Sequence, residues 1–293
     1  MAAMAVRARV FRTVLGLVVC ALTSGCAREA PTSESTFREP DTQRDYQVIR
    51  SRAHDRRQKA AVLFALHAYA TAPETLVTAW SLAEKAVEGR GLLLVVPRGT
   101  KDANSQFFWN ASLGCCVNTP SPPDDLGYLR AVLRDVRKRY VVDPERVYAL
   151  GVSNGGFMAH RWACAAGGDL RGIVAVSGVG PGIGDAPCEP SVPVRVLQIH
   201  GDADDVIAYD GGVGTRGPYP SAPATVQRWR DLNHCGAKPV EDSDWSALHG
   251  STSWARCQGP SAEVAFWTFK GGGHHLRSLR FAVGELLDFL EQR

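Results

Sequence analysis

The chain has 293 residues and a formal net charge of +3, from 33 lysines and arginines against 30 aspartates and glutamates. Residues 1–25 contain three of the arginines and no acidic residue, so the rest of the chain is electrically balanced. A balanced chain lacks the basic surplus that attracts nucleic acid or an anionic membrane surface, and we predict neither as a partner.

The N-terminal segment has the pattern of a bacterial export signal. Three arginines precede an apolar run at residues 14–22 that is too short to span a bilayer. Small residues and then Cys26 follow, as in a lipobox, where a peptidase cuts before the cysteine and the cysteine is acylated. We predict that residues 1–25 are a signal peptide and that Cys26 carries a lipid anchor to the cell envelope, with ordinary secretion as the alternative.

One large domain is predicted to follow a linker. Residues 26–45 are rich in Pro, Ser, Thr and Glu and have few apolar anchors, which indicates a flexible tether. Residues 46–293 have a length that fits one α/β domain.

Six cysteines lie beyond the signal segment: Cys115, Cys116, Cys164, Cys188, Cys235 and Cys257. An even number in an exported chain predicts disulfides, and their spacing is not that of a zinc site. We predict a bond between Cys235 and Cys257, which would close a polar loop with little core of its own. The adjacent Cys115 and Cys116 are open to bonding with each other or with separate partners.

Apolar runs of strand length alternate with amphipathic helical patterns along the chain. The predicted strands are residues 61–66, 91–96, 146–150, 172–176, 194–199 and 264–269. The predicted helices are residues 73–87, 124–140, 157–166, 224–234 and 276–290. This alternation predicts an α/β fold with a doubly wound, mostly parallel sheet and helices on both faces. Ligands of such sheets bind at the carboxyl ends of the strands.

The sequence GVSNGG at residues 151–156 follows a predicted strand and precedes a predicted helix. This is the nucleophile-elbow pattern, in which glycines flank the serine because a side chain there would collide with a neighbouring strand or helix. The turn would present the Ser153 hydroxyl and aim the amide of Asn154 at a developing oxyanion. We predict Ser153 as a nucleophile, and the alternative is an ordinary serine in a glycine-rich turn.

An acid and then a histidine follow Ser153 in the chain order of this fold. The sequence HGDADD at residues 200–205 follows one predicted strand, and GGGHH at residues 271–275 follows the last. We predict His274 as general base, with His275 as the alternative. Asp204 is predicted to orient the imidazole, with Asp202 and Asp205 as alternatives.

Two further positions are candidates for contact with substrate. The amide of Tyr69, in the loop after strand 61–66, is predicted as the second oxyanion donor, and a plain strand end is the alternative. Trp109, together with Trp245 and Trp254, is a candidate aromatic platform for substrate, although tryptophan is more often packed in a core.

Nine stretches carry a family resemblance: LHAY at 66–69, PRGT at 97–100, FWNA at 108–111, CC at 115–116, DDLGYL at 124–129, DPERVY at 143–148, GVSNGG at 151–156, HGDAD at 200–204 and GGGH at 271–274. In order and content they resemble the polyhydroxybutyrate depolymerase and feruloyl esterase-like family of α/β-hydrolases. The resemblance implies an esterase with Ser153, Asp204 and His274 as its triad, without metal or organic cofactor. The sequence departs from the family at two places, so the resemblance does not predict the substrate pocket. Ala68 stands where the family usually has glycine, and His275-Leu276-Arg277 stands where it usually has Thr-Trp-Pro.

The predicted function is therefore that of an exported serine esterase acting on small or oligomeric esters. The candidate substrates are feruloyl or acetyl esters and hydroxybutyrate oligomers. Two alternatives are retained: a serine peptidase of the same fold, and a catalytically silent surface binding protein.

Overall fold

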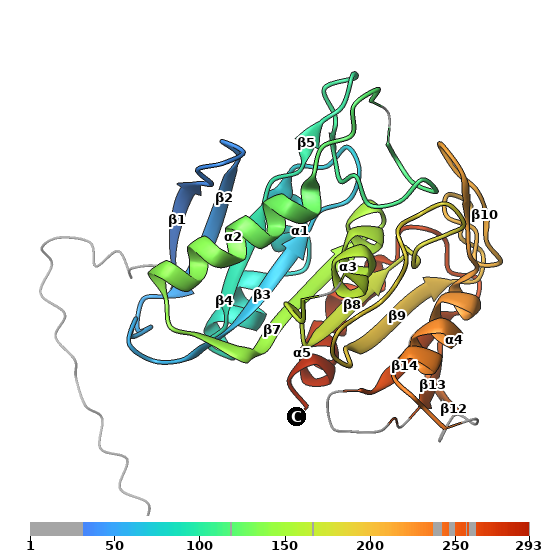
Figure 1. The fold of residues 1–293 in the computed structure, drawn as a ribbon. Coiled ribbons are helices and arrows are strands. Elements are labelled where there is room, and N and C mark those ends of the chain that lie inside the picture. Colours follow the sequence, from blue (N-terminus) through green and yellow to red (C-terminus); the bar gives the residue numbers. More distant parts are fainter. Residues whose placement is uncertain are drawn as a thin grey trace, which may run out of the picture. The chain divides into compact units, whose positions relative to one another are not determined.

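A sheet of ten described strands, in the order β1-β2-β4-β3-β7-β8-β9-β14-β13-β12, organises the computed structural model (Figure 1). The structure describes residues 32–117, 119–165, 167–236, 242–245, 250–255, 257 and 262–292, with the backbone alone for residues 242–245 and 250–255. The strands are β1 (Thr32–Arg38), β2 (Asp45–Ser51), β3 (Ala60–Leu66), β4 (Leu93–Pro97), β7 (Val142–Val152), β8 (Gly172–Val176), β9 (Arg195–Gly201), β12 (Asp242–Trp245), β13 (Gly250–Ala255) and β14 (Val264–Phe269). Two small hairpins stand apart, β5 (Thr100–Lys101) with β6 (Phe107–Phe108) and β10 (Gly212–Val213) with β11 (Pro218–Tyr219).

The six central strands of the sheet, β4, β3, β7, β8, β9 and β14, run parallel. They are the six strands predicted from the sequence. Antiparallel pairs extend both edges of the sheet, β1 with β2 on one side and β12 with β13 on the other. The predicted α/β fold with a mostly parallel sheet is confirmed.

Helices cover both faces of the sheet. One layer contains α2 (Asp125–Arg139), α3 (Asn154–Cys164) and α4 (Ala222–Leu232), and the other contains α1 (Pro73–Ala79), η1 (Ala83–Glu88), η2 (Arg277–Phe281) and α5 (Val283–Glu291). Along β3, Phe64 packs toward the first layer, whereas Leu63 and Ala65 pack toward the second. Because both faces are covered, every residue of β3 is buried, which explains its uninterrupted apolar sequence.

Two predicted helices are broken. The helix predicted at residues 73–87 is divided into α1 and the π-helical segment η1, because Ser81 between them has a φ of 50°. That left-handed conformation cannot continue a right-handed helix. The helix predicted at residues 276–290 is likewise divided into the 3₁₀ segment η2 and α5 at Ala282, whose φ of −98° and ψ of 12° lie outside the α-helical region.

The prediction of a flexible tether is wrong for residues 32–45. β1 pairs with β2 along its whole length, from Thr32 opposite Ser51 to Arg38 opposite Asp45. Backbone pairing and the contact of Phe37 with Tyr46, at 5.5 Å between ring centroids, hold this polar segment to the sheet edge. The predicted signal peptide, the anchor at Cys26 and the first part of the predicted tether lie outside the described residues. No helix within the described ranges is long and apolar enough to cross a membrane.

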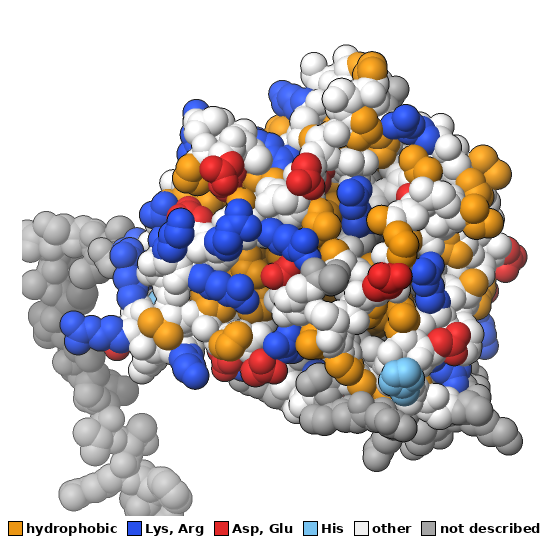
Figure 2. Space-filling view, in the orientation of Figure 1, with side chains coloured by type: hydrophobic (Ala, Val, Ile, Leu, Met, Phe, Trp, Pro, Cys, Tyr) orange, Lys and Arg blue, Asp and Glu red, His pale blue; other side chains and the backbone are white. Residues whose placement is uncertain are grey.

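Basic side chains gather over α2 on the face drawn in Figure 2, with acidic side chains among them. Arg130 forms an ion pair with Asp169 at 2.8 Å, and Arg139 forms one with Asp135 at 3.1 Å. Both cations are thus partly neutralised by neighbouring carboxylates.

Two buried histidines have strongly lowered pKa values. His160 on α3 is fully buried; its Nδ1 accepts a hydrogen bond from the Trp229 indole at 3.0 Å, so its Nε2 carries the proton and donates to Gln198 Oε1 at 2.8 Å. Burial disfavours the charged imidazolium and lowers the pKa of His160 to about 4. Burial likewise lowers the pKa of His67, at the end of β3, to about 4.

We expect the free energy of unfolding to decrease as the pH falls from about 6.5 toward 4. In that window histidines of the unfolded chain take up protons that His67 and His160 do not bind in the native state, at a cost of about 2 kcal/mol each at pH 5. Urea denaturation at pH 7.5 and pH 5 measures the difference. His160→Gln should reduce it, whereas His234→Asn, at an exposed position, should leave it unchanged.

Candidate active site

Ser153 lies at the sharp turn between β7 and α3. Its φ of 54° and ψ of −120° fall in a region that costs free energy for a residue with a side chain, and its N–H donates to Val176 O on β8 at 2.7 Å. The side chain is 7% exposed. This is the geometry of a nucleophile elbow at the carboxyl end of a central strand.

Two glycines let the elbow pack without a gap. A Cβ added to Gly151 would lie 2.0 Å from Gly155 O, and a Cβ added to Gly155 would lie 2.1 Å from Leu66 O on β3. Both distances are far inside van der Waals contact with backbone atoms that cannot move independently. The glycines therefore bring the start of α3 against the ends of β7 and β3.

Gly155→Ala should lower the free energy of unfolding by about 3 kcal/mol or prevent folding, because the added methyl group collides with backbone. Gly284→Ala in α5 is the matched control, since no atom lies within 4 Å of its added Cβ and alanine favours a helix. Thermal unfolding of both variants makes the comparison. Equal midpoints would show that the elbow tolerates a side chain at this position.

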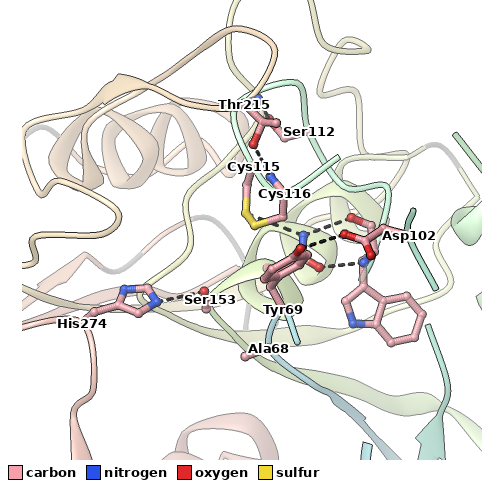
Figure 3. The surroundings of a disulfide bond; sticks show 12 residues. Ala68, Tyr69, Asp102, Ser112, Cys115, Cys116, Ser153, Thr215 and His274 are labelled. Atoms are coloured by element: carbon pink, nitrogen blue, oxygen red, sulfur yellow. Dashed lines mark hydrogen bonds between the residues drawn. A yellow bond between two sulfur atoms is a disulfide. The ribbon is translucent and has the colours of Figure 1, made fainter. Parts of the chain in front are cut away.

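Ser153, His274 and Asp204 form a hydrogen-bonded chain, although they follow three different strands. Figure 3 draws the bond between Ser153 and His274. His274 Nδ1 lies 3.0 and 2.9 Å from the two carboxylate oxygens of Asp204, so this nitrogen carries the proton and donates. His274 Nε2 is then free to accept from the Ser153 hydroxyl, at 2.9 Å. Such a chain can remove a proton from the serine and stabilise the resulting imidazolium.

The Asp204 carboxylate is buried but well supplied with donors. Burial alone would raise its pKa, yet hydrogen bonds from His200, His274 and the N–H of Ile207 outweigh that effect and hold the pKa well below its usual range. His200 Nε2 lies 3.3 Å from Asp204 Oδ2 and 2.8 Å from Ile207 O. The contact between His200 and Asp204 was not predicted from the sequence, because residues four apart need not meet in a loop.

The alternative acid and base residues lie elsewhere. Asp202 is exposed and accepts a hydrogen bond from the Gly271 N–H at 2.6 Å, so it shapes the glycine loop before His274. Asp205 and His275 are both exposed. The hydroxyl of Ser177, the residue after β8, donates to the His274 carbonyl oxygen at 3.1 Å and holds that residue in place.

The loop after β3 is held by its own hydrogen bonds. The Ala70 N–H donates to Phe107 O at 2.9 Å, and the Thr71 hydroxyl donates to Ala68 O at 2.9 Å. The Tyr69 hydroxyl donates to Asp102 Oδ2 at 2.7 Å, and this bond raises the pKa of Tyr69. Figure 3 draws Ala68 and Tyr69 near Ser153. Asn154 is the first residue of α3, where helix geometry leaves the N–H without an intrahelical partner.

Trp109 is not a substrate platform, because its side chain is completely buried. Its indole N–H donates to His67 O at 3.0 Å, and its ring packs on the His67 ring at 4.8 Å between centroids. Its main chain exchanges two hydrogen bonds with the Asn154 side chain: the N–H donates to Oδ1 at 2.6 Å, and the carbonyl accepts from Nδ2 at 3.0 Å. Trp109 therefore links the loop after β3 to the elbow. The side chains of Trp245 and Trp254 lie outside the described residues.

All six cysteines that follow residue 26 are paired. The predicted Cys235–Cys257 bond is present, a second bond joins Cys164 and Cys188, and the adjacent Cys115 and Cys116 bond to each other. Within the described residues, no group of three or more His, Cys, Asp or Glu side chains is placed to hold a metal ion.

A hollow of about 510 Å³ lies between the loop after β8 and the start of α4, with Pro181, Pro218 and Trp229 in its walls. None of the triad residues lines it. We therefore take the hydrogen-bonded chain at Ser153, rather than this hollow, as the candidate reacting centre.

Sequence comparison finds relatives that are named as esterases. It is 31% identical over 204 residues to a protein of Nocardia uniformis subsp. tsuyamanensis named "Putative esterase NocK", an alignment that covers 64% of this chain and 58% of that protein. It is 26% identical over 203 residues to feruloyl esterase B of Piromyces equi, covering 65% of this chain and 35% of that protein. The chain thus aligns with less than two thirds of either relative. No family model matches it.

Solved structures show the same fold. An acetyl xylan esterase from Aspergillus awamori superposes with a TM-score of 0.63 at 14% identity, over 88% of this chain and 99% of that one. A ferulic acid esterase superposes with a TM-score of 0.55 at 14% identity, over 89% of this chain and 97% of that one. These likenesses show that the chain has the α/β-hydrolase fold of these esterases, and its sequence is similar to that of proteins named as esterases.

Proposed function

We propose that this protein is an exported serine esterase that hydrolyses carboxylic esters through an acyl-enzyme intermediate. Ser153 is the nucleophile, His274 the general base, and Asp204 the residue that orients His274. The observation that carries the proposal is the continuous hydrogen-bonded chain from the Ser153 hydroxyl through His274 to the buried Asp204 carboxylate. The names of the relatives support the same chemistry.

In the first half-reaction the Ser153 oxygen attacks the ester carbonyl carbon while its proton moves to His274 Nε2. The carbonyl oxygen becomes negative and accepts hydrogen bonds from the amides of Asn154 and Tyr69. When the tetrahedral intermediate collapses, the bond to the alcohol oxygen breaks and His274 gives that oxygen its proton. The alcohol leaves, and the acyl group stays on Ser153.

In the second half-reaction water takes the place of the alcohol. It gives a proton to His274 as its oxygen attacks the acyl carbon, and the same two amides hold the oxyanion. Collapse breaks the bond to Ser153, whose oxygen recovers the proton from His274. The products are a carboxylic acid and the free enzyme.

The proposed substrates are soluble feruloyl or acetyl esters, or hydroxybutyrate oligomers. Support for the first class comes from the names of the relative in Piromyces equi and of the two superposed structures, which refer to feruloyl, ferulic acid and acetyl xylan esters. The oligomer class follows from the motif resemblance at residues 66–69, 151–156 and 271–274.

Export is proposed on two grounds: the charged and apolar pattern of residues 1–25, and the three disulfides, which form and persist outside the reducing cytosol. Acylation of Cys26 would then hold the enzyme at the cell envelope.

Hydrolysis of a panel tests the proposal. The panel comprises 4-nitrophenyl acetate, methyl ferulate, acetylated xylan, 3-hydroxybutyrate oligomers and a 4-nitroanilide amide, each assayed with the purified oxidised protein. We expect ester turnover that far exceeds amide turnover, together with labelling of Ser153 by a fluorophosphonate probe.

The remaining outcomes separate the rival functions. Comparable turnover of amide and esters would favour a peptidase. No turnover together with no labelling would contradict the proposal and leave a catalytically silent binding protein. Preference between methyl ferulate, xylan and the oligomers assigns the substrate class.

A further inference from the structure

The disulfide between the adjacent residues Cys115 and Cys116 lies beside the candidate active site. Cys115 is buried, and Cys116 is half-buried with a φ of 68°. Figure 3 draws Ser153, His274 and Tyr69 among the surroundings of this bond. Nothing in the two half-reactions above uses either sulfur atom, so the bond needs another explanation.

The bond does not make the folded protein more stable by reducing the conformational entropy of the unfolded chain, as most disulfides do. A disulfide gains stability from the unfolded state in proportion to the logarithm of the loop that it closes. Cys164–Cys188 and Cys235–Cys257 span sequence separations of 24 and 22, for which this effect is about 3 kcal/mol. Cys115–Cys116 has a separation of 1 and constrains almost nothing beyond the dipeptide itself.

The bond contacts the residue that follows the nucleophile. Asn154 Nδ2 lies 3.7 Å from Cys115 Sγ, within hydrogen-bond distance for sulfur. The same side chain is fully buried and holds the two hydrogen bonds to the Trp109 main chain described above. The Cys115 sulfur therefore provides a second acceptor for the Nδ2 group of the Asn154 carboxamide, beside the Trp109 carbonyl oxygen. Because the carboxamide and the N–H proposed for the oxyanion hole belong to one residue, contacts that hold the carboxamide also restrain the position of the N–H.

Residues 112–116, which carry the disulfide, are also held by hydrogen bonds to two other loops. The Cys116 N–H donates to Thr215 Oγ1 at 2.9 Å. The Asp185 carboxylate accepts from the Ser112 hydroxyl at 2.6 Å and from the Leu113 N–H at 2.7 Å. Residues 112–116 are thus tied to the loops after β8 and around the β10–β11 hairpin, and they cannot shift away from Asn154 without breaking these bonds.

We propose that the Cys115–Cys116 disulfide is a positioning element of the oxyanion hole, which holds Asn154 so that its N–H points at the developing oxyanion. The proposal rests on the proposed esterase function. Without the bond the two side chains rotate independently, and the buried Nδ2 of Asn154 loses one of its contacts. An error of about 1 Å in such a donor can cost 10²-fold in rate, and loss of one donor costs about 10²- to 10³-fold.

The test compares wild-type protein with the Cys115→Ala/Cys116→Ala variant on 4-nitrophenyl acetate. We expect kcat to fall by at least about tenfold while KM changes by less than about threefold. The midpoint of thermal unfolding should change little, because the lost bond closes no loop. Cys235→Ala/Cys257→Ala is the matched control: it should lower the unfolding midpoint and leave kcat of the folded protein unchanged.

A double-mutant cycle with Asn154→Ala distinguishes positioning from a general structural role. If the disulfide acts through Asn154, its removal should change kcat by less than about threefold when Asn154 is already alanine. The rate of fluorophosphonate labelling should fall in parallel with kcat, because the phosphonyl oxygen occupies the oxyanion hole. If the alanine pair does not fold, Cys115→Ser/Cys116→Ser is measured in the same way.

Three results would overturn the inference: an unchanged kcat in the folded disulfide variant, full additivity with Asn154→Ala, or a loss explained entirely by the unfolded fraction. A wild-type protein that neither hydrolyses esters nor reacts with the probe would instead refute the proposed function, and the inference with it. Wild-type activity with an insensitive variant refutes the inference alone.

Discussion

Ser153→Ala is expected to lower kcat for 4-nitrophenyl acetate by about 10⁴- to 10⁶-fold while the protein stays folded. The variant keeps His274, Asp204 and the oxyanion donors, but no oxygen remains at the end of the hydrogen-bonded chain to attack the carbonyl carbon. KM should change little, because the hydroxyl contributes more to the transition state than to ground-state binding. Initial rates and a thermal unfolding curve measure both quantities.

Ser191→Ala provides the control for Ser153→Ala. Ser191 is an exposed serine that precedes β9, at the opposite edge of the sheet from the reacting centre. Its replacement should leave kcat within about twofold. Esterase activity that survives Ser153→Ala at wild-type level would show that another residue carries the chemistry.

Asp204→Asn should lower kcat by about 10³- to 10⁴-fold. The carboxylate accepts hydrogen bonds from His274, His200 and the N–H groups of Val206 and Ile207, so it sits in a site built for a negative charge. The amide of asparagine keeps the shape but loses that charge, and its NH₂ group favours the wrong tautomer of His274. The pH-rate profile and kcat of the variant measure the loss.

Variants of the two neighbouring aspartates, Asp205 and Asp202, are the controls for Asp204→Asn, and we expect them to lower kcat by different amounts. Asp205→Asn, at an exposed position, should leave kcat within about twofold. Asp202→Asn should have an intermediate effect, because Asp202 accepts from the Gly271 N–H and shapes the loop that carries His274. A loss at Asp205 equal to that at Asp204 would contradict the assignment of the acid.

The central strands could be predicted because both of their faces are covered. β3 and β8 are buried along their whole length, and the apolar runs that result are visible in the sequence. β1 and β12 could not be predicted in this way, because their sequences contain no apolar run. They join the sheet edges through backbone hydrogen bonds, which almost any side chains permit, and the TSESTFR sequence of β1 has the composition of a linker.

The chain positions of the triad could be predicted from topology, but its finer geometry could not. Parallel strands bring the segments after β7, β9 and β14 to one edge, so a serine, an acid and a histidine were expected to meet there. Which aspartate turns inward depends on the turn at residues 201–204, which is held in place by a hydrogen bond from the Ala203 N–H to Gly272 O at 3.0 Å. This contact joins residues 69 positions apart. The burial of Trp109 depends in the same way on distant neighbours, His67 and Asn154.

The early start of β1 limits how far the domain could lie from a membrane that holds Cys26. If Cys26 is acylated, only residues 27–31 separate the lipid from Thr32, the first residue of the sheet. Even fully extended, that stretch spans about 20 Å, less than the width of the domain that it would hold. The domain would then lie directly against the membrane and could not reach far from it. As the proposed esterase, it would then act on ester substrates that diffuse to the cell surface.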